Sequence, residues 1–354
     1  MPRLRVQVER LRPDPTDGLS FLLRSPFARG GGRHRQGPAR AASHRTQAVR
    51  RSGARPRPAD GGGPAAAQGG AGGGGLRIRG HPAGPHRRTR ERRPGGDPLM
   101  KPVALLTNDD GVGAAFLHAL AGALRQAGFK VAVAAPSGER SWIGRAFSRH
   151  QEVSVASLPG PGDQTWSIDG TPSDCVNIAL GHLLASPPDV VVSGMNIGFN
   201  ATMPLSLSSG TLAGATEGAA WGLPAVACSF DLEQSLFEKA HRRSGVCPDE
   251  LRPHLESACR HAAAYALSLV GQKQSGMPVH SLNYPSTMTD AAKMTRTTPA
   301  VVKHGSLFRP SELGFRFAWN DGVTVESGHD SDLAALERGE VSLTVFDFGR
   351  FARP

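Results

Sequence analysis

The chain has 354 residues, with 41 lysines and arginines against 30 aspartates and glutamates, which gives a formal net charge of +11 at pH 7. The composition excludes a membrane-spanning helix, because no apolar stretch approaches the ~18 residues that one needs, and no secretory signal is evident. The four cysteines form no Cys-x-x-Cys pair, so neither a zinc site nor a disulfide framework is indicated. We therefore expect a cytoplasmic protein.

The basic residues are concentrated in the first part of the chain. Residues 1–100 hold 21 arginines, no lysine and six acidic residues, a net charge of +15, whereas residues 101–354 carry 20 basic and 24 acidic residues, a net charge of −4. Glycine, proline, alanine and arginine dominate residues 1–99, and such a segment buries too little apolar surface to offset its ordering entropy. We predict that this tail is disordered apart from a short turn near its start.

Four interpretations of the tail remain open. An Arg- and Gly-rich segment is suited to binding nucleic acid through its phosphates, it shares its composition with organellar transit peptides, and it also fits a solvated linker. The fourth interpretation is that residues 1–99 are no part of the natural protein, because translation begins at Met100. That start lies immediately before the first predicted strand, and arginine without lysine fits GC-rich DNA read outside its coding frame.

The first predicted strand covers residues 103–107 and is followed at once by an acidic box, residues Asn108, Asp109, Asp110 and Gly111. Ligands of open α/β sheets bind outside the carboxyl ends of the strands. Two adjacent carboxylates at such a position are costly unless a cation neutralises them, and Mg²⁺ or Mn²⁺ suits hard oxygen ligands. The alternative is an ordinary solvated turn.

A predicted helix over 114–127 leads to a second strand at 130–135, which ends in a polar loop. Ser141 in this loop offers a hydroxyl to a metal or a phosphate. Arg140 either meets a phosphate or pairs with Glu139 or solvent. By itself this loop is weak evidence for a site, and it becomes a candidate mainly together with the acidic box.

The next predicted helix, residues 172–185, carries a helix-start signal. Thr171 suits the N-cap, Pro172 the first helical position and Asp174 the third. This structural role is nearly sufficient to explain the segment, and a direct catalytic role is the alternative.

A strand predicted at 188–193 is followed by Gly194, which lets the backbone approach a ligand. Asn196 then offers a neutral carbonyl oxygen to a cation, and Asn200 follows in the same loop. Polar groups therefore follow a further strand at its carboxyl end.

Ser208, Ser209, Gly210 and Thr211 open a helix predicted over 210–221. Hydroxyls, a glycine and free amides at a helix N-terminus make an anion site, for which phosphate is the obvious ligand, and ordinary capping is the alternative. No Walker loop occurs. The remaining expected elements are a strand at 223–229, a helix at 253–271, hairpin strands at 297–303, 314–318 and 322–327, and a final strand at 340–347.

Short apolar strands that alternate with helices predict βαβ units and a parallel sheet, and hence one α/β domain of roughly 250 residues. Two carboxylates, a hydroxyl, an asparagine and an anion-binding helix start would then lie at strand ends of one sheet. This combination suits metal-assisted hydrolysis of a phosphate ester. A metal clamps a phosphoryl oxygen and acidifies a bound water, while the helix start stabilises the phosphoryl charge.

The same motifs, in this order, resemble the SurE family of survival-protein nucleotidases. The resemblance runs from Met100 to about Phe348 and includes the TNDDG, APxxERS, DGTPxDCV, SGMNIGxN and SGTxxGAxEG boxes. It implies a Rossmann-like three-layer αβα core with a mostly parallel sheet in residues 100–350. It also implies a C-terminal β-hairpin or arm, about residues 305–348, that is swapped between subunits of a homodimer or homotetramer.

The resemblance further implies a metal-dependent phosphatase, a 5′-nucleotidase that hydrolyses nucleoside 5′- and 3′-monophosphates. Asp109, Asp110, Ser141 and Asn196 match the ligands of one Mg²⁺ or Mn²⁺ ion per subunit. Asn108 sits beside the metal in the family pattern, and one of the two aspartates is expected to orient the attacking water. The residues that match substrate-binding positions are Asn196, Asn200, Ser209, Gly210 and Thr211.

This sequence also departs from the family pattern around the expected pocket. Trp142, Ile143 and Arg145 stand where small residues are usual, and Thr202 and Ser208 are unusual as well. Two alternatives therefore stay open: the same chemistry on polyphosphate or another phosphoester, and a non-catalytic nucleic-acid-binding protein that uses the Arg-rich tail.

Overall fold

The computed structural model describes residues 20–22, 101–242, 246–303, 305–317 and 324–350. Within the predicted tail it describes only strand β1 (Ser20–Leu22), which pairs antiparallel with β13 (Thr324–Glu326). We expected at most a turn there, because three residues are too few to show a strand period. The rest of the tail, with the prediction of disorder and the four interpretations of it, lies outside the described residues.

A nine-stranded sheet forms the centre of the domain, in the order β4-β5-β3-β2-β6-β7-β8-β14-β9. The strands from β5 to β8 in this order are all parallel to their neighbours, whereas β4 and β14 join antiparallel. The predicted α/β class with a mostly parallel sheet is thus confirmed. The strand bounds are β2 (Val103–Thr107), β3 (Lys130–Pro136), β4 (Val155–Ser157), β5 (Gln164–Ile168), β6 (Val190–Ile197), β7 (Ala225–Phe230), β8 (Pro278–Tyr284), β9 (Met294–Arg296) and β14 (Val341–Asp347).

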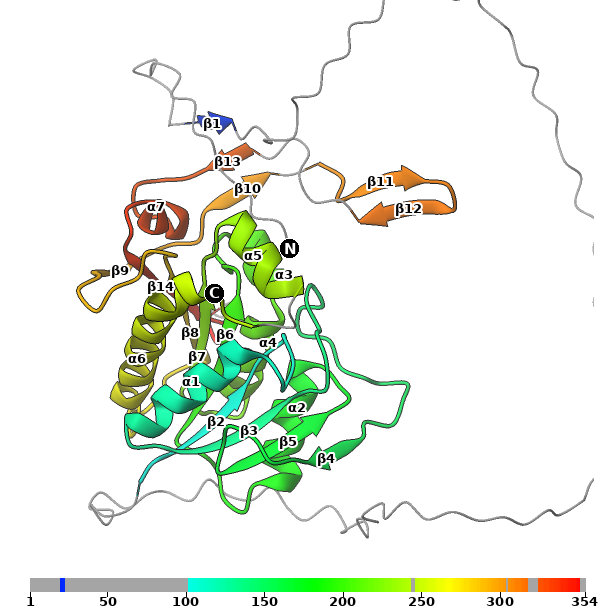
Figure 1. Ribbon diagram of the computed structural model, residues 1–354, viewed down its shortest axis with the longest axis vertical. Helices are drawn as coiled ribbons and strands as arrows, with labels where there is room; N and C mark the ends of the chain where they lie inside the picture. The colour runs from blue at the N-terminus through cyan, green and yellow to red at the C-terminus, as the bar shows by residue number, and fades with distance from the viewer. Residues whose placement is uncertain (1–19, 23–100, 243–245, 304, 318–323, 351–354) are drawn as a thin grey trace, which may run out of the picture. The chain divides into compact units, whose positions relative to one another are not determined.

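Helices cover both faces of this sheet, which gives the expected three layers (Figure 1). On one face α1 (Ala115–Gln126) and α6 (Arg252–Ser268) pack against each other and against the sheet. On the other face lie α2 (Pro172–Ile178), which continues as a π-helix (Ala179–Leu183), and α4 (Gly210–Ala220).

The central strand β2 shows why the sequence specifies this arrangement. Ala104 and Leu106 belong to the core under α1 and α6, whereas Leu105 belongs to the core under α2. A strand buried on both faces reads as a continuous apolar run rather than as an alternating one. The run therefore ends where the strand reaches solvent, and the acidic box follows at that edge.

Several elements carry too little sequence signal to be expected. Strand β4 is exposed throughout, and β5 mixes polar and apolar residues over only five positions. Strand β6 continues four residues beyond the predicted end at 193, with a register shift between Ser193 and Asn196. The other unpredicted helices are α3 (Met203–Ser208), α5 (Gln234–Arg242), the 3-10 turn η2 (Asp249–Leu251) and α7 (Asp332–Glu337).

The C-terminal part contains a short strand within or overlapping each of the three expected hairpin ranges, and a further strand, β11 (Phe308–Ser311), that was not expected. Strand β10 (Val301–Lys303) pairs with β13, and β11 forms a hairpin with β12 (Gly314–Phe317). The hairpin strands are exposed at every residue. The predicted arm of about 305–348 thus contains a hairpin, a helix and the sheet strand β14. Exchange of this arm between subunits stays a prediction.

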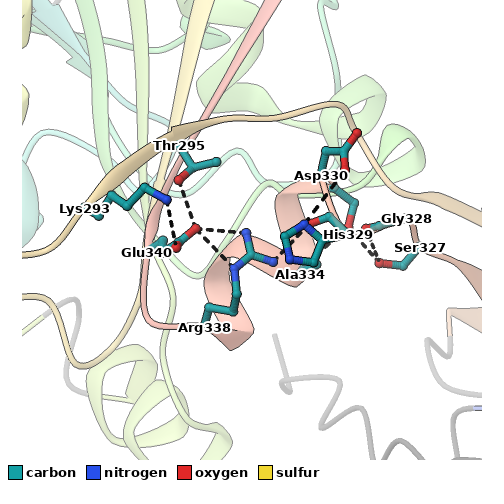
Figure 2. A network of polar contacts seen from close by, with 10 residues as sticks. Lys293, Thr295, Ser327, Gly328, His329, Asp330, Ala334, Arg338 and Glu340 are labelled. Carbon is teal, nitrogen blue, oxygen red and sulfur yellow. Dashed lines mark hydrogen bonds and ion pairs between the residues drawn. The ribbon is translucent and has the colours of Figure 1, made fainter.

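Two polar clusters connect this part to the sheet. Figure 2 shows Glu340 accepting hydrogen bonds from Arg338 at 2.8 Å and Thr295 at 2.9 Å, with Lys293 3.5 Å away. The bonds from Arg338 and Thr295 lower the pKa of Glu340 to about 2. At the start of α7, the buried Asp332 carboxylate accepts the backbone amides of Thr202 at 2.6 Å, Ala300 at 2.9 Å and Leu333 at 2.8 Å.

Among the described residues, no helix has both the length and the apolar character that would let it cross a membrane.

Candidate active site

The acidic box forms a tight turn after β2. Asn108 holds it closed, because its side-chain amide donates to the Gly111 carbonyl at 3.0 Å and accepts from the Gly111 amide at 3.2 Å. Gly111 has a φ of +102°, and a Cβ there would lie 3.2 Å from the backbone of Gly138 in the loop after β3. Asn108 and Gly111 therefore shape the turn that presents Asp109 and Asp110.

Asp109 is buried against the start of α4. The Thr211 hydroxyl donates to Asp109 Oδ1 at 2.6 Å, and Asp109 is only 4% exposed. A Cβ on Gly210 would lie 2.7 Å from the Asp109 Cβ, so only glycine allows this close approach. Burial raises the pKa of Asp109 to about 6, against the lowering effect of the Thr211 hydrogen bonds and with a further rise from the charge of Glu139.

Asp110 is held by β6 instead. Its Oδ2 accepts the backbone amide of Ile197 at 3.1 Å. Burial first, and then the charge of Asp109, raise the pKa of Asp110 well above its usual value. The two neighbouring carboxyls therefore oppose each other's ionisation, which is the electrostatic situation that a bound cation relieves.

Asn196 lies beside the residue that holds Asp110, at the register shift in β6. Its side-chain nitrogen donates to the Gly198 carbonyl at 2.7 Å, which leaves the amide oxygen as the atom that can accept from or bind a cation. The structure thus brings Asn196 to the acidic box, as the parallel topology predicts.

Ser141 joins the site through Glu139, for which the sequence suggested only a possible pairing with Arg140. The Ser141 hydroxyl donates to Glu139 Oε1 at 2.9 Å, and the charge of Glu139 raises the pKa of both Asp109 and Asp110. Arg140 instead pairs with Asp169 at 2.9 Å. The sequence could have indicated Glu139 as a site residue, since it is acidic, follows the carboxyl end of β3 and stands two positions before Ser141.

The start of α4 combines capping with contact to the acidic box. Ser209 is the N-cap, and its side-chain oxygen accepts the Leu212 amide at 3.0 Å. Thr211 turns to Asp109 rather than outward. The positive end of the helix dipole therefore faces the acidic box as well as any anion bound there.

Asn200 is held by the two strands next to β6 in the sheet order, β7 and β8. Its side-chain nitrogen donates to the Ser229 hydroxyl at 2.8 Å on β7, and its backbone amide donates to Asn283 Oδ1 at 2.7 Å on β8. These bonds anchor the loop after β6 to two strands. Asn283 was not among the predicted site residues, since it lies on a strand, β8, that is distant in sequence from the loop it holds.

The loop after Ser141 is fastened to α4 by a buried carboxylate. Glu217 is 2% exposed and accepts bonds from Arg145 at 2.5 Å, Asn177 at 2.8 Å and the Trp221 indole at 3.0 Å. The Gly144 amide also donates to the Ser208 carbonyl at 3.0 Å. The residues that depart from the family pattern, Trp142, Ile143 and Arg145, thus lie in a loop that is bonded to α4. The start of α4 is the candidate phosphate position.

The helix start of α2 holds the same loop from its other end. Thr171 and Asp174 form the predicted capping box, which confirms the structural role of that segment. The Thr171 hydroxyl also donates to the Ala146 carbonyl at 2.7 Å, and Asp174 accepts the Ser148 amide at 3.3 Å. The segment therefore acts by supporting the loop beside the site.

Within the described residues, no three histidine, cysteine or acidic side chains are arranged to hold a metal ion by themselves. The candidate set instead combines two carboxylates with an amide and a hydroxyl oxygen. An all-oxygen set with two acidic members whose pKa values are raised by burial fits a hard divalent cation such as Mg²⁺ or Mn²⁺.

Comparisons with known proteins agree with this fold. A family model described as survival protein SurE matches residues 104–305. A 5′-nucleotidase SurE of Desulfovibrio desulfuricans is 38% identical over 254 residues, which are 69% of this chain and 93% of the relative. Another of Nitratidesulfovibrio vulgaris is 36% identical over 256 residues, 70% of this chain and 87% of the relative. The crystal structure of a SurE protein from Aquifex aeolicus shares the fold, with a TM-score of 0.54 and 24% identity over 71% of this chain and 96% of that one.

Proposed function

The chain belongs to the SurE family, and from this membership and the geometry of the acidic box we propose that it is a metal-dependent nucleotidase. Family membership supports a phosphatase that acts on nucleotides. The finer proposal is hydrolysis of nucleoside 5′- and 3′-monophosphates to nucleoside and phosphate. The observation that carries it is the pair of adjacent carboxyls, Asp109 and Asp110, with raised pKa values at the carboxyl end of β2.

We propose that Asp109, Asp110, Ser141 and Asn196 hold one Mg²⁺ or Mn²⁺ ion per subunit. When bound, such an ion polarises a phosphoryl oxygen and makes a water acidic enough to attack phosphorus. Support comes from the bonds that pre-orient the donors, since the Thr211 hydroxyl fixes Oδ1 of Asp109 and the backbone amide of Ile197 fixes Oδ2 of Asp110. Asn108 contributes by closing the turn.

The protein's own groups supply orientation and charge. One carboxylate, that of Asp109 or Asp110, accepts a hydrogen bond from the attacking water and directs its lone pair. Ser209 and Gly210 at the start of α4 face the phosphate, where the partial positive charge of the helix end stabilises the developing negative charge. Thr211 keeps Asp109 in place, and Asn200 keeps the adjoining loop in place.

We further propose a cytoplasmic homodimer or homotetramer built by the arm of residues 305–348. The hairpin β11–β12 supports this proposal, because Leu313 and Phe315 at its far end are 102% and 74% exposed. Apolar side chains gathered on one exposed element are typical of a surface that another chain covers. Sedimentation of the full chain as a monomer would count against this assembly.

The test of the nucleotidase proposal is phosphate release by the full chain from nucleoside 5′- and 3′-monophosphates, polyphosphate and a sugar phosphate. Each assay is run with Mn²⁺, with Mg²⁺ and with EDTA. Release from nucleotides that depends on the metal is expected. Release only from polyphosphate or only from the sugar phosphate would replace the proposed substrate, and metal-independent release would overturn the proposed chemistry.

A further inference from the structure

Two aromatic side chains from distant parts of the chain meet beside the acidic site. The Trp142 and Phe317 rings lie edge to face, with centroids 5.1 Å apart and planes at 61°. Phe308 contacts Phe317 in the same way, at 5.8 Å and 87°. Phe317 is 43% exposed and Trp142 is half-buried, so the pair keeps aromatic surface available to a ligand.

The position of Trp142 follows from its neighbours. It comes directly after Ser141, whose hydroxyl bonds to Glu139 next to the two aspartates, and consecutive Cα atoms are only about 3.8 Å apart. Two residues later the Gly144 amide bonds to the Ser208 carbonyl, immediately before the start of α4. The aromatic pair therefore stands at the edge of the site whose other side is the candidate phosphate position.

The backbone of Trp142 is unusual as well. Its φ of +61° lies in the left-handed region, where a bulky residue is a rare choice. The loop is held on both sides of it, by the Ser141–Glu139 bond before and by the Gly144–Ser208 and Arg145–Glu217 contacts after. An aromatic side chain is thus fixed in one place where the family pattern has small residues.

We propose that Trp142 and Phe317 form the nucleobase subsite of this protein. The proposal rests on the proposed nucleotidase function and adds the part of the substrate that is recognised. Every base offers a π-face for stacking on an aromatic ring, and such stacking tolerates changes of sequence or base. The subsite therefore selects nucleotides as a class over phosphoesters that lack a base, and it discriminates little between one base and another.

The experiment compares a nucleoside 5′-monophosphate with ribose 5-phosphate, which has the same phosphoester but no base. Stacking of ~1–3 kcal/mol per base corresponds to roughly 5- to 150-fold in kcat/KM. Trp142→Ala and Phe317→Ala are expected to lower kcat/KM for the nucleotide within that range, mainly through KM, and to affect ribose 5-phosphate far less. Trp142→Phe should recover most of the loss. Glu312→Ala, in the exposed turn between β11 and β12, is the matched control and should behave as wild type.

Equal losses on both substrates would overturn the subsite, because they would show that the rings only support the loop. Unaltered kinetics in both alanine variants would overturn it too. Failure of the nucleotidase proposal looks different, since wild type would then release phosphate from ribose 5-phosphate but not from nucleotides. If wild type cleaves neither, calorimetry with adenosine and ribose in EDTA decides: adenosine binding that Trp142→Ala removes supports the subsite, and its absence in wild type contradicts it.

Discussion

The Thr211 hydroxyl donates a hydrogen bond of 2.6 Å to Asp109 Oδ1 across 102 positions of sequence. This bond joins the turn after β2 to the start of α4, the two elements on which the proposed metal and phosphate positions depend. It also stabilises the ionised form of Asp109 against the effect of burial. The Thr211–Asp109 bond thus affects both the position of the Asp109 carboxyl and the fraction of it that is ionised.

Replacing Thr211 by valine keeps the shape of the side chain and removes the hydroxyl. A larger fraction of Asp109 should then be protonated at neutral pH, and kcat/KM should fall by roughly 10-fold, the order expected for a hydrogen bond to a charged group. The acid limb of the pH–rate profile should move to higher pH. Thr211→Ser is the control and should stay close to wild type; a valine variant with an unshifted profile would contradict this role.

The raised pKa values of Asp109 and Asp110 make the stability of the metal-free protein depend on pH. A carboxyl whose pKa rises from 3.8 to about 6 on folding stabilises the folded state fully below its usual pKa. That contribution is lost as the pH rises through the folded value. In EDTA the wild-type Tm should therefore fall, relative to Asp109→Asn, between about pH 4 and about pH 6, and the two curves should run parallel above that range. Added Mn²⁺ should restore the wild-type Tm at the higher pH, and should do less for the variant.

Tm curves for wild type and Asp109→Asn in EDTA that stay parallel through that range as well would contradict this prediction. The comparison between the two proteins matters more than either curve alone, because other carboxyls titrate over the same range. Asp290→Asn serves as the control, since Asp290 lies on the surface in an ion pair with Arg260.

The Arg145–Glu217 pair should contribute to stability because Glu217 is buried and its charge needs a partner. Removing the cation with Arg145→Met leaves a carboxylate that is 2% exposed with only Asn177 and the Trp221 indole as donors. Loss of a partner from a buried pair costs about 3–5 kcal/mol, and a value near or below the lower end is expected because water screens the half-exposed arginine. The double variant Arg145→Met, Glu217→Gln should recover much of this loss in urea unfolding. Additive effects of the two substitutions would show that the pair is not coupled.

The parts of the fold predicted correctly are those in which local pattern and topology agree. Residues such as Leu105 and Val191 belong to apolar runs because their strands are buried on both faces. Asp110 and the part of β6 that carries Asn196 lie together, through the bond of the Ile197 amide to Asp110, because carboxyl ends of parallel strands share one edge of the sheet. The sequence therefore predicts that the acidic box, Asn196 and the start of α4 lie near one another, and their roles stay predictions.

The contacts that escaped prediction depend on loops whose path has no period. Arg145 and Glu217 are 72 positions apart, and Trp142 meets Phe317 from a separate hairpin. Nothing in either local sequence indicates the partner. The sequence left open whether Arg140 meets a phosphate, pairs with Glu139 or faces solvent, and the fold pairs Arg140 with Asp169 while Glu139 accepts the hydrogen bond of Ser141.

The most direct test of the proposed site is phosphate release from a nucleoside 5′-monophosphate by wild type and by Asp110→Asn, with saturating Mn²⁺ and with EDTA. Asp290→Asn is the surface control. We expect wild type and Asp290→Asn to release phosphate in a reaction that EDTA abolishes, and Asp110→Asn to lose at least about 100-fold in rate while its circular dichroism shows a retained fold. Wild-type rates in a folded Asp110→Asn protein would contradict the assignment of the acidic box as the reaction centre.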